Sequence, residues 1–168
     1  AVTLHTPTRI TDVPDLDHQS YIPAGGTALF DAIVNALKTV EQTVQDGDRA
    51  LVVILTDGEE NSSREVRDAS VIRNLIQSHE QRGNYTFAFL NASPDDFLNE
   101  TLGIATANTY RYVPGSAAET QAAFANLSRS TMAYSQSLES ASRSFVQPEE
   151  NTTDDDEITP ETWVTTSR

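Results

Sequence analysis

Residues 50–63 read ALVVILTDGEENSS, and their pattern indicates the fold class. Its first seven residues form an uninterrupted apolar run, which is typical of a strand buried on both faces of a parallel sheet. Asp57 and Gly58 end the run with a pair that favours a tight turn. We therefore predict a core strand over residues 50–56 and a loop over residues 58–67.

Helical and strand patterns alternate on both sides of this strand. The expected elements are a short edge strand over 2–6, a helix over about 28–44 that stops near Gly47, a helix from Asp68 to Gly83, a strand over 85–90, a helix from Ser93 to about Leu102, a strand near 110–113, and a helix from Ser116 to about Ser140. Ser116 and Glu119 have the spacing of a capping box. The apolar stripe of that last helix includes Phe124, Leu127, Met132 and Tyr134.

Strand–helix alternation of this length predicts parallel βαβ units. The expected fold class is therefore α/β, with a doubly wound, mostly parallel sheet in a domain over residues 1–142. Residues 143–168 are expected to form a disordered acidic tail, because the stretch after Pro148 has seven acidic residues and one Arg.

The charge balance excludes some classes of partner. The net charge of −14 comes from 25 acidic and 11 basic residues, and such a field repels phosphate backbones and anionic lipids. We expect neither nucleic acid nor a membrane as a partner. The chain has no Cys, which fits a reducing compartment, and we expect a cytoplasmic location.

Two polar loops are expected at the carboxyl ends of the strands, where open α/β sheets bind ligands. One is Gly25-Gly26-Thr27 before a helix, and the other begins at Asp57. A carboxylate from Asp57 and a hydroxyl from Thr27 are oxygen donors that suit Mg²⁺ or Mn²⁺.

Each of these residues also has a simpler structural interpretation. Thr27 has the position of a helix N-cap, and Asp57 that of a turn former. Glu59 and Glu60 are interpreted as solvated loop acids. Asp31, one turn into the helix, is interpreted as a partner of the helix dipole.

The sequences GGTALFDAI (25–33), ALVVILTDGEENSS (50–63) and FAFLNA (87–92) together resemble von Willebrand factor A (vWA) domains, particularly bacterial stand-alone ones. The resemblance covers roughly residues 1–140. It implies that Thr27 is the hydroxyl ligand of the second metal-site loop and that Asp57 is the acid of the third.

The chain departs from this family in its first metal-site loop. That loop has a DxSxS motif at the end of the first strand, and no DxSxS occurs in this sequence. Residues 1–11 resemble the family's antiparallel edge strand, so the resemblance implies that the domain is N-terminally incomplete. We expect a fragment, an incomplete gene product or a chain that borrows the missing elements. We also expect an incomplete metal-ion-dependent adhesion site that binds its ion weakly.

By this resemblance the chain is a metal-dependent protein-interaction module and not an enzyme, and its partner supplies an acidic residue to the ion. An alternative is a phosphoryl-transfer enzyme, haloacid dehalogenase-like or receiver-like, that uses Asp57. Against it, the dehalogenase type needs an Asp where Glu59 stands, and Lys38 is the only Lys. A third interpretation is a degenerate remnant without a metal role.

Overall fold

The structure is a computed structural model that describes residues 5–15, 17–20, 25–56, 60–92, 97–113, 115–137 and 145–146. Its elements are η1 (Ile10–Asp12), α1 (Leu29–Glu41), β1 (Ala50–Thr56), α2 (Ala69–Glu80), β2 (Tyr85–Asn91), α3 (Phe97–Leu102), η2 (Thr106–Asn108), β3 (Thr109–Arg111) and α4 (Ala117–Gln136). The mixed α/β class is therefore confirmed. The predicted strand over 2–6 does not form at His5 and Thr6, and residues 1–4 lie outside the described part.

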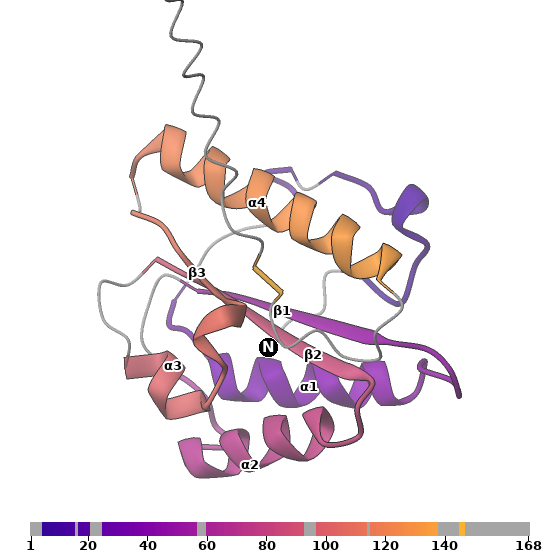
Figure 1. Cartoon of the computed structure of the whole chain (residues 1–168). Helices are drawn as coiled ribbons and strands as arrows, with labels where there is room; N and C mark the ends of the chain where they lie inside the picture. Colours follow the sequence, from indigo (N-terminus) through magenta and orange to yellow (C-terminus); the bar gives the residue numbers. More distant parts are fainter. Residues whose placement is uncertain are drawn as a thin grey trace, which may run out of the picture.

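The described strands form one parallel sheet in the order β1-β2-β3. Ala50 is in register with Tyr85 and Thr56 with Asn91, so β1 and β2 pair over their whole length. Figure 1 shows α1 and α2 on one face of this sheet and α4 on the other. The carboxyl ends of the strands therefore meet at a single rim.

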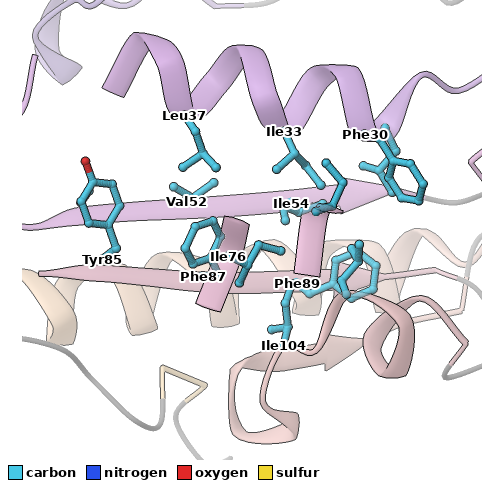
Figure 2. Packing of buried hydrophobic residues seen from close by; sticks show 14 residues of the cluster. Phe30, Ile33, Leu37, Val52, Ile54, Ile76, Tyr85, Phe87, Phe89 and Ile104 are labelled. Atoms are coloured by element: carbon cyan, nitrogen blue, oxygen red, sulfur yellow. The ribbon is translucent and has the colours of Figure 1, made fainter. Parts of the chain in front are cut away.

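The main core lies between the sheet and the two helices α1 and α2. Ile33 and Leu37 of α1 point toward Val52 and Ile54 of β1, as Figure 2 shows. The aromatic side chains of β2 on this face are fully buried. Burial of each large apolar side chain contributes about 2 kcal/mol, so this cluster supplies the main driving force for the fold.

The second face of the sheet has a smaller and more polar core. Ala88 packs against Tyr134 and Phe145, and Phe145 is only 2% exposed although it lies in the segment expected to be a tail. Its backbone N–H donates to the side-chain oxygen of Asn108 at 2.8 Å. The other residues of the expected tail, 143–144 and 147–168, lie outside the described residues.

The face that α4 turns toward the sheet differs from the predicted stripe. Phe124 and Met132 are 45% and 60% exposed, so that part of the prediction is wrong. Tyr134 of that stripe is buried and Leu127 packs against the smaller core, as predicted, and the other buried residues of α4 are Ala123, Asn126 and Ser130. Small and polar side chains at these positions let the helix lie close to the sheet but bury little apolar area.

The prediction that β1 is buried on both faces is correct for one face only. Val52 and Ile54 are buried beneath α1, whereas Val53 and Leu55 are 38% and 49% exposed. Leu51 packs against the smaller core on the second face. The second layer therefore covers the beginning of the strand and leaves its carboxyl end open.

The helix ends were predicted in part. Asp68 caps α2 as expected and accepts from the N–H of Ser70 at 2.9 Å. Ser116 caps α4 and accepts from the N–H of Glu119. Glu119 does not complete the capping box, because its carboxylate accepts instead from the N–H of Val113 at 2.8 Å. It thereby joins the segment after β3 to the first turn of α4.

Candidate functional site

Thr27 lies beside the loop that follows β1. Its backbone N–H donates to Asn61 Oδ1 at 2.8 Å. Its carbonyl oxygen accepts from the N–H groups of Asn61 and Ser62 at 3.0 and 3.1 Å. The two polar loops predicted to meet at the carboxyl rim are therefore hydrogen-bonded to each other.

Thr27 is not the N-cap of the helix, so this interpretation is wrong. The N-cap is Ala28, which makes no side-chain hydrogen bond. The backbone of Thr27 is held instead by the loop after β1, one residue before the cap. Among the described residues, its hydroxyl has no hydrogen-bond partner.

Asp57, the second predicted ligand, lies outside the described residues. Thr56, the residue before it, ends β1 and accepts from the N–H of Ala92 at 3.3 Å. The distance between the oxygens of Thr27 and Asp57 therefore stays a prediction.

Gly26 allows the close approach of the two loops. A Cβ at this position would overlap the side-chain oxygens of Asn61 and Ser62 and would lie 3.1 Å from the Cβ of Ser62. With any other residue here, the side chains of Asn61 and Ser62 would have to shift. Glycine fits here because it has no side chain to occupy this space. The sequence alone does not reveal the contact that requires it.

The interpretation of Glu60 as a solvated loop acid is wrong, because its carboxylate accepts several hydrogen bonds. Its carboxylate accepts from the N–H of Phe30 at 2.8 Å, from the N–H groups of Ser62 and Ser63 at 2.9 and 2.7 Å, and from the Ser63 hydroxyl at 2.7 Å. Burial by itself raises the pKa of Glu60, but these hydrogen bonds outweigh it and hold the pKa below its usual value. The side chain is therefore an ionised cap for the first turn of α1.

Asp31 has a larger role than compensation of the helix dipole. It is only 7% exposed, and its carboxylate accepts from the N–H of Arg64 at 2.8 Å and from those of Glu65 and Val66 at 3.1 Å each. The hydrogen bonds from Arg64 and Val66 lower the pKa of Asp31 most. The N–H of Asp31 also donates to Ser63 Oγ at 3.1 Å. Hydrogen bonds therefore run both from the loop to α1 and from α1 to the loop.

These contacts limit the donors that remain for a cation. The oxygens of Glu60 and Asp31 already accept N–H groups, and Asn61 Oδ1 accepts from the N–H of Thr27 and the Ser62 hydroxyl. In the described part of the chain, no three His, Asp or Glu side chains gather as a metal-binding group. Among the described residues, the hydroxyl of Thr27 makes no hydrogen bond, so its oxygen fits as one ligand of a hydrated ion.

A polar pocket of about 490 Å³ opens at the same loop. Among the described residues, its lining is formed by Glu60, Asn61, Ser62, Ser63, Arg64 and Arg67. The two arginines are exposed and stand out in a chain of net charge −14. The described part of this pocket is therefore polar and carries charges of both signs, from Glu60 and from the two arginines.

Sequence reasoning did not identify Glu60, Ser63 and Asn61 as structural residues of this site. A weak signal exists, since a run of Asn and Ser after an acid often bonds to backbone groups. That signal indicates a hydrogen-bonded loop but cannot identify a helix terminus 30 residues away as its partner.

The buried histidine lies at the other end of α1. His79 Nδ1 is 2.8 Å from the carbonyl oxygen of Leu75, and Nε2 is 3.1 Å from Glu41 Oε1. Arg82 donates to the same Glu41 oxygen at 3.0 Å, and the rings of His79 and Tyr85 form a T-shaped pair. This cluster connects the carboxyl ends of α1 and α2 and serves the packing of the two helices.

Within the described residues, no helix combines the length and apolar character that crossing a bilayer requires. Comparison of the chain with protein-family models, with curated proteins and with solved structures found no match.

Proposed function

We propose that the chain is a protein-interaction module of the vWA type, with a doubly wound sheet. In this proposal Thr27 and Asp57 hold Mg²⁺ or Mn²⁺ at the carboxyl rim, and a partner protein completes the coordination of the ion with an Asp or Glu side chain. Since the chain has no Cys, the proposal places the module in a reducing compartment such as the cytoplasm.

The observation that supports the proposal most is the reciprocal hydrogen bonding between Thr27 and Asn61. It brings the loop before α1 to the loop after β1, at the end of a parallel sheet where ligands bind. Asn61 comes only four positions after Asp57, so chain geometry keeps their Cα atoms within about 14 Å. Among the described residues, the hydroxyl of Thr27 has no hydrogen-bond partner, so its oxygen is available to an ion.

The same contacts explain why the site binds weakly in this chain alone. Glu60 and Asp31 are committed to backbone N–H groups, and the DxSxS loop of the family is absent from the sequence. Mg²⁺ and Mn²⁺ accept a few protein oxygens and retain several waters, so two ligands hold the ion loosely. A partner carboxylate then adds a third protein ligand, and the affinity of the site for the ion increases.

The test is a titration of the ¹⁵N-labelled chain with Mn²⁺, whose unpaired electrons broaden nearby amide signals. We expect binding weaker than micromolar, with broadening centred on Thr27 and Asn61. Thr27→Val and Asp57→Asn should abolish the broadening, and Asp46→Asn, an exposed acid outside the site, should leave it intact. Broadening centred elsewhere, or submicromolar affinity, would disprove the proposal.

A further inference from the structure

The segment that joins β1 to α2 uses its acidic and basic side chains differently. The Glu60 carboxylate accepts three backbone N–H groups and the Ser63 hydroxyl, and Asp68 caps α2. Arg64 and Arg67 are exposed, and neither guanidinium forms a hydrogen bond or an ion pair within the described residues. These two acids therefore stabilise the fold, whereas the two arginines remain available to an external partner.

The backbone that carries the two arginines is held in place on both sides. The N–H of Arg64 donates to the Asp31 carboxylate at 2.8 Å, and the N–H of Val66 donates to the same carboxylate at 3.1 Å. Asp68, the residue after Arg67, is the N-cap of α2. Because this backbone is already ordered, a partner that binds the two guanidiniums loses less entropy than it would on a free loop.

Both arginines line the polar pocket of about 490 Å³ at this loop. Asn61 and Ser62 line it too, and their N–H groups donate to the carbonyl oxygen of Thr27. The pocket therefore borders the loop that carries Thr27. The charge of Glu60 in the same lining is offset by the N–H and O–H donors around it, so the unpaired charges that the described lining offers are positive.

We propose that Arg64 and Arg67 bind a second carboxylate of the partner protein, in addition to the one that completes the coordination of the ion. The contact segment of the partner then carries two acidic residues. A guanidinium can hold a carboxylate through two parallel hydrogen bonds, which fix its orientation as well as attract it. The inference rests on the proposed function for the acidic nature of the partner, but the contact with the arginines does not require the ion.

The net charge of −14 limits the anions that suit this pocket. A long polyanion such as nucleic acid meets repulsion along its whole length. A short segment with two carboxylates contacts the loop alone, and charges farther away than about 8 Å are largely screened at physiological ionic strength. The pair of arginines therefore favours a short acidic segment of a protein.

The experiment titrates the ¹⁵N-labelled full chain with two capped peptides up to millimolar concentration. One is Gly-Ser-Glu-Gly-Glu-Ser-Gly, and the other is its uncharged analogue Gly-Ser-Gln-Gly-Gln-Ser-Gly. One series contains EDTA and a second contains Mg²⁺. In both series we expect the acidic peptide to shift the backbone and side-chain Nε–H signals of Arg64 and Arg67, and the uncharged peptide to shift neither.

Two double variants locate the contact. Arg64→Gln with Arg67→Gln should weaken binding of the acidic peptide about tenfold, because two ion pairs at the surface are lost. Arg9→Gln with Arg129→Gln removes the same charge at exposed positions outside the pocket, and it should leave the affinity unchanged. The comparison separates a contact in the pocket from the effect of net charge.

Three outcomes would overturn the inference. These are an absence of shifts at Arg64 and Arg67 in both series, an equal loss of affinity in the two double variants, or shifts of equal size with inorganic phosphate at the same concentration. The last result would identify a general anion site.

Failure of the metal site gives a different result. If Mn²⁺ causes no broadening at Thr27 but the acidic peptide still shifts the two arginines in EDTA, the ion is excluded and the arginine contact is supported. If the broadening is present and the peptide shifts are absent, the contact with the arginines is excluded and the metal site is retained.

Discussion

The carboxylate of Glu60, four residues after β1, accepts the backbone N–H of Phe30 in the first turn of α1 at 2.8 Å. A helix start normally finds such an acceptor in its own N-cap side chain, but here the N-cap is Ala28 and offers none. The cap is therefore supplied by a loop far away in the sequence. This arrangement makes the start of α1 and the loop after β1 one cooperative unit.

Glu60→Gln should destabilise the fold by about 2 kcal/mol, because a charged acceptor of several hydrogen bonds is replaced by a neutral amide with one acceptor oxygen. Urea unfolding followed by circular dichroism measures this change. Glu65→Gln is the matched control, since Glu65 is exposed and only its backbone N–H is bonded, to Asp31. Equal losses in the two variants would show that the contacts of Glu60 do not stabilise the fold.

Acid should weaken the fold through Asp31 and Glu60. The pKa of each carboxyl is lowered by the N–H groups that it accepts, so the folded state binds fewer protons than the unfolded state. Their stabilisation is complete above the ordinary carboxyl pKa of about 4 and is lost as pH falls through the lowered values. Glu80 acts in the opposite direction, because burial raises its pKa.

Urea midpoints measured from pH 7 down to pH 3 test this dependence. The midpoint should fall below about pH 4, and it should fall less steeply in Glu60→Gln, which has lost one of the carboxyl groups whose pKa is lowered. An identical acid profile in this variant and the parent chain would contradict the assignment to Glu60.

Gly26→Ala should destabilise the chain by about 2 kcal/mol, the usual scale of an overpacked contact, because its Cβ meets the side chains of Asn61 and Ser62. Ser62→Gly in the same chain removes part of that overlap and should restore part of the loss. Thermal unfolding of the two single variants and the double variant measures the coupling. Strict additivity would mean that the two loops are not in contact.

Much of the fold follows from local pattern. The run over 50–56 and the alternation beyond it predicted β1, α2, β2 and the start of α4 almost residue by residue, because hydrophobic periodicity and Asp or Ser caps are local signals. The errors concern neighbours in space. The exposure of Val53 and Leu55 depends on what covers the second face, and the burial of Asn126 depends on how α4 is rotated over the sheet.

The candidate site was predicted to a smaller extent. Sequence position placed Thr27 next to the loop after β1, and the hydrogen bond from Thr27 to Asn61 confirms that neighbourhood. The roles of Glu60 and Asp31 were missed, because both acids bond to backbone groups about 30 residues away. Composition and spacing do not carry that information.

Arg49 should be the main anchor of α4, because the sheet-facing side of that helix is largely small or polar. Its guanidinium lies 4.8 Å from the ring centre of Tyr134 and donates to the Tyr134 carbonyl and to Ser137 Oγ at 3.0 Å each.

Arg49→Ala should lower the free energy of unfolding by about 2 kcal/mol, because the charged hydrogen bonds and the cation–π contact are lost. Amide hydrogen exchange over residues 133–137 should speed up while that of β2 is less affected. Arg129→Ala, an exposed substitution on the same helix, should leave both rates unchanged. Faster exchange in β2 to the same degree as in α4 would mean that the helix does not open separately from the sheet.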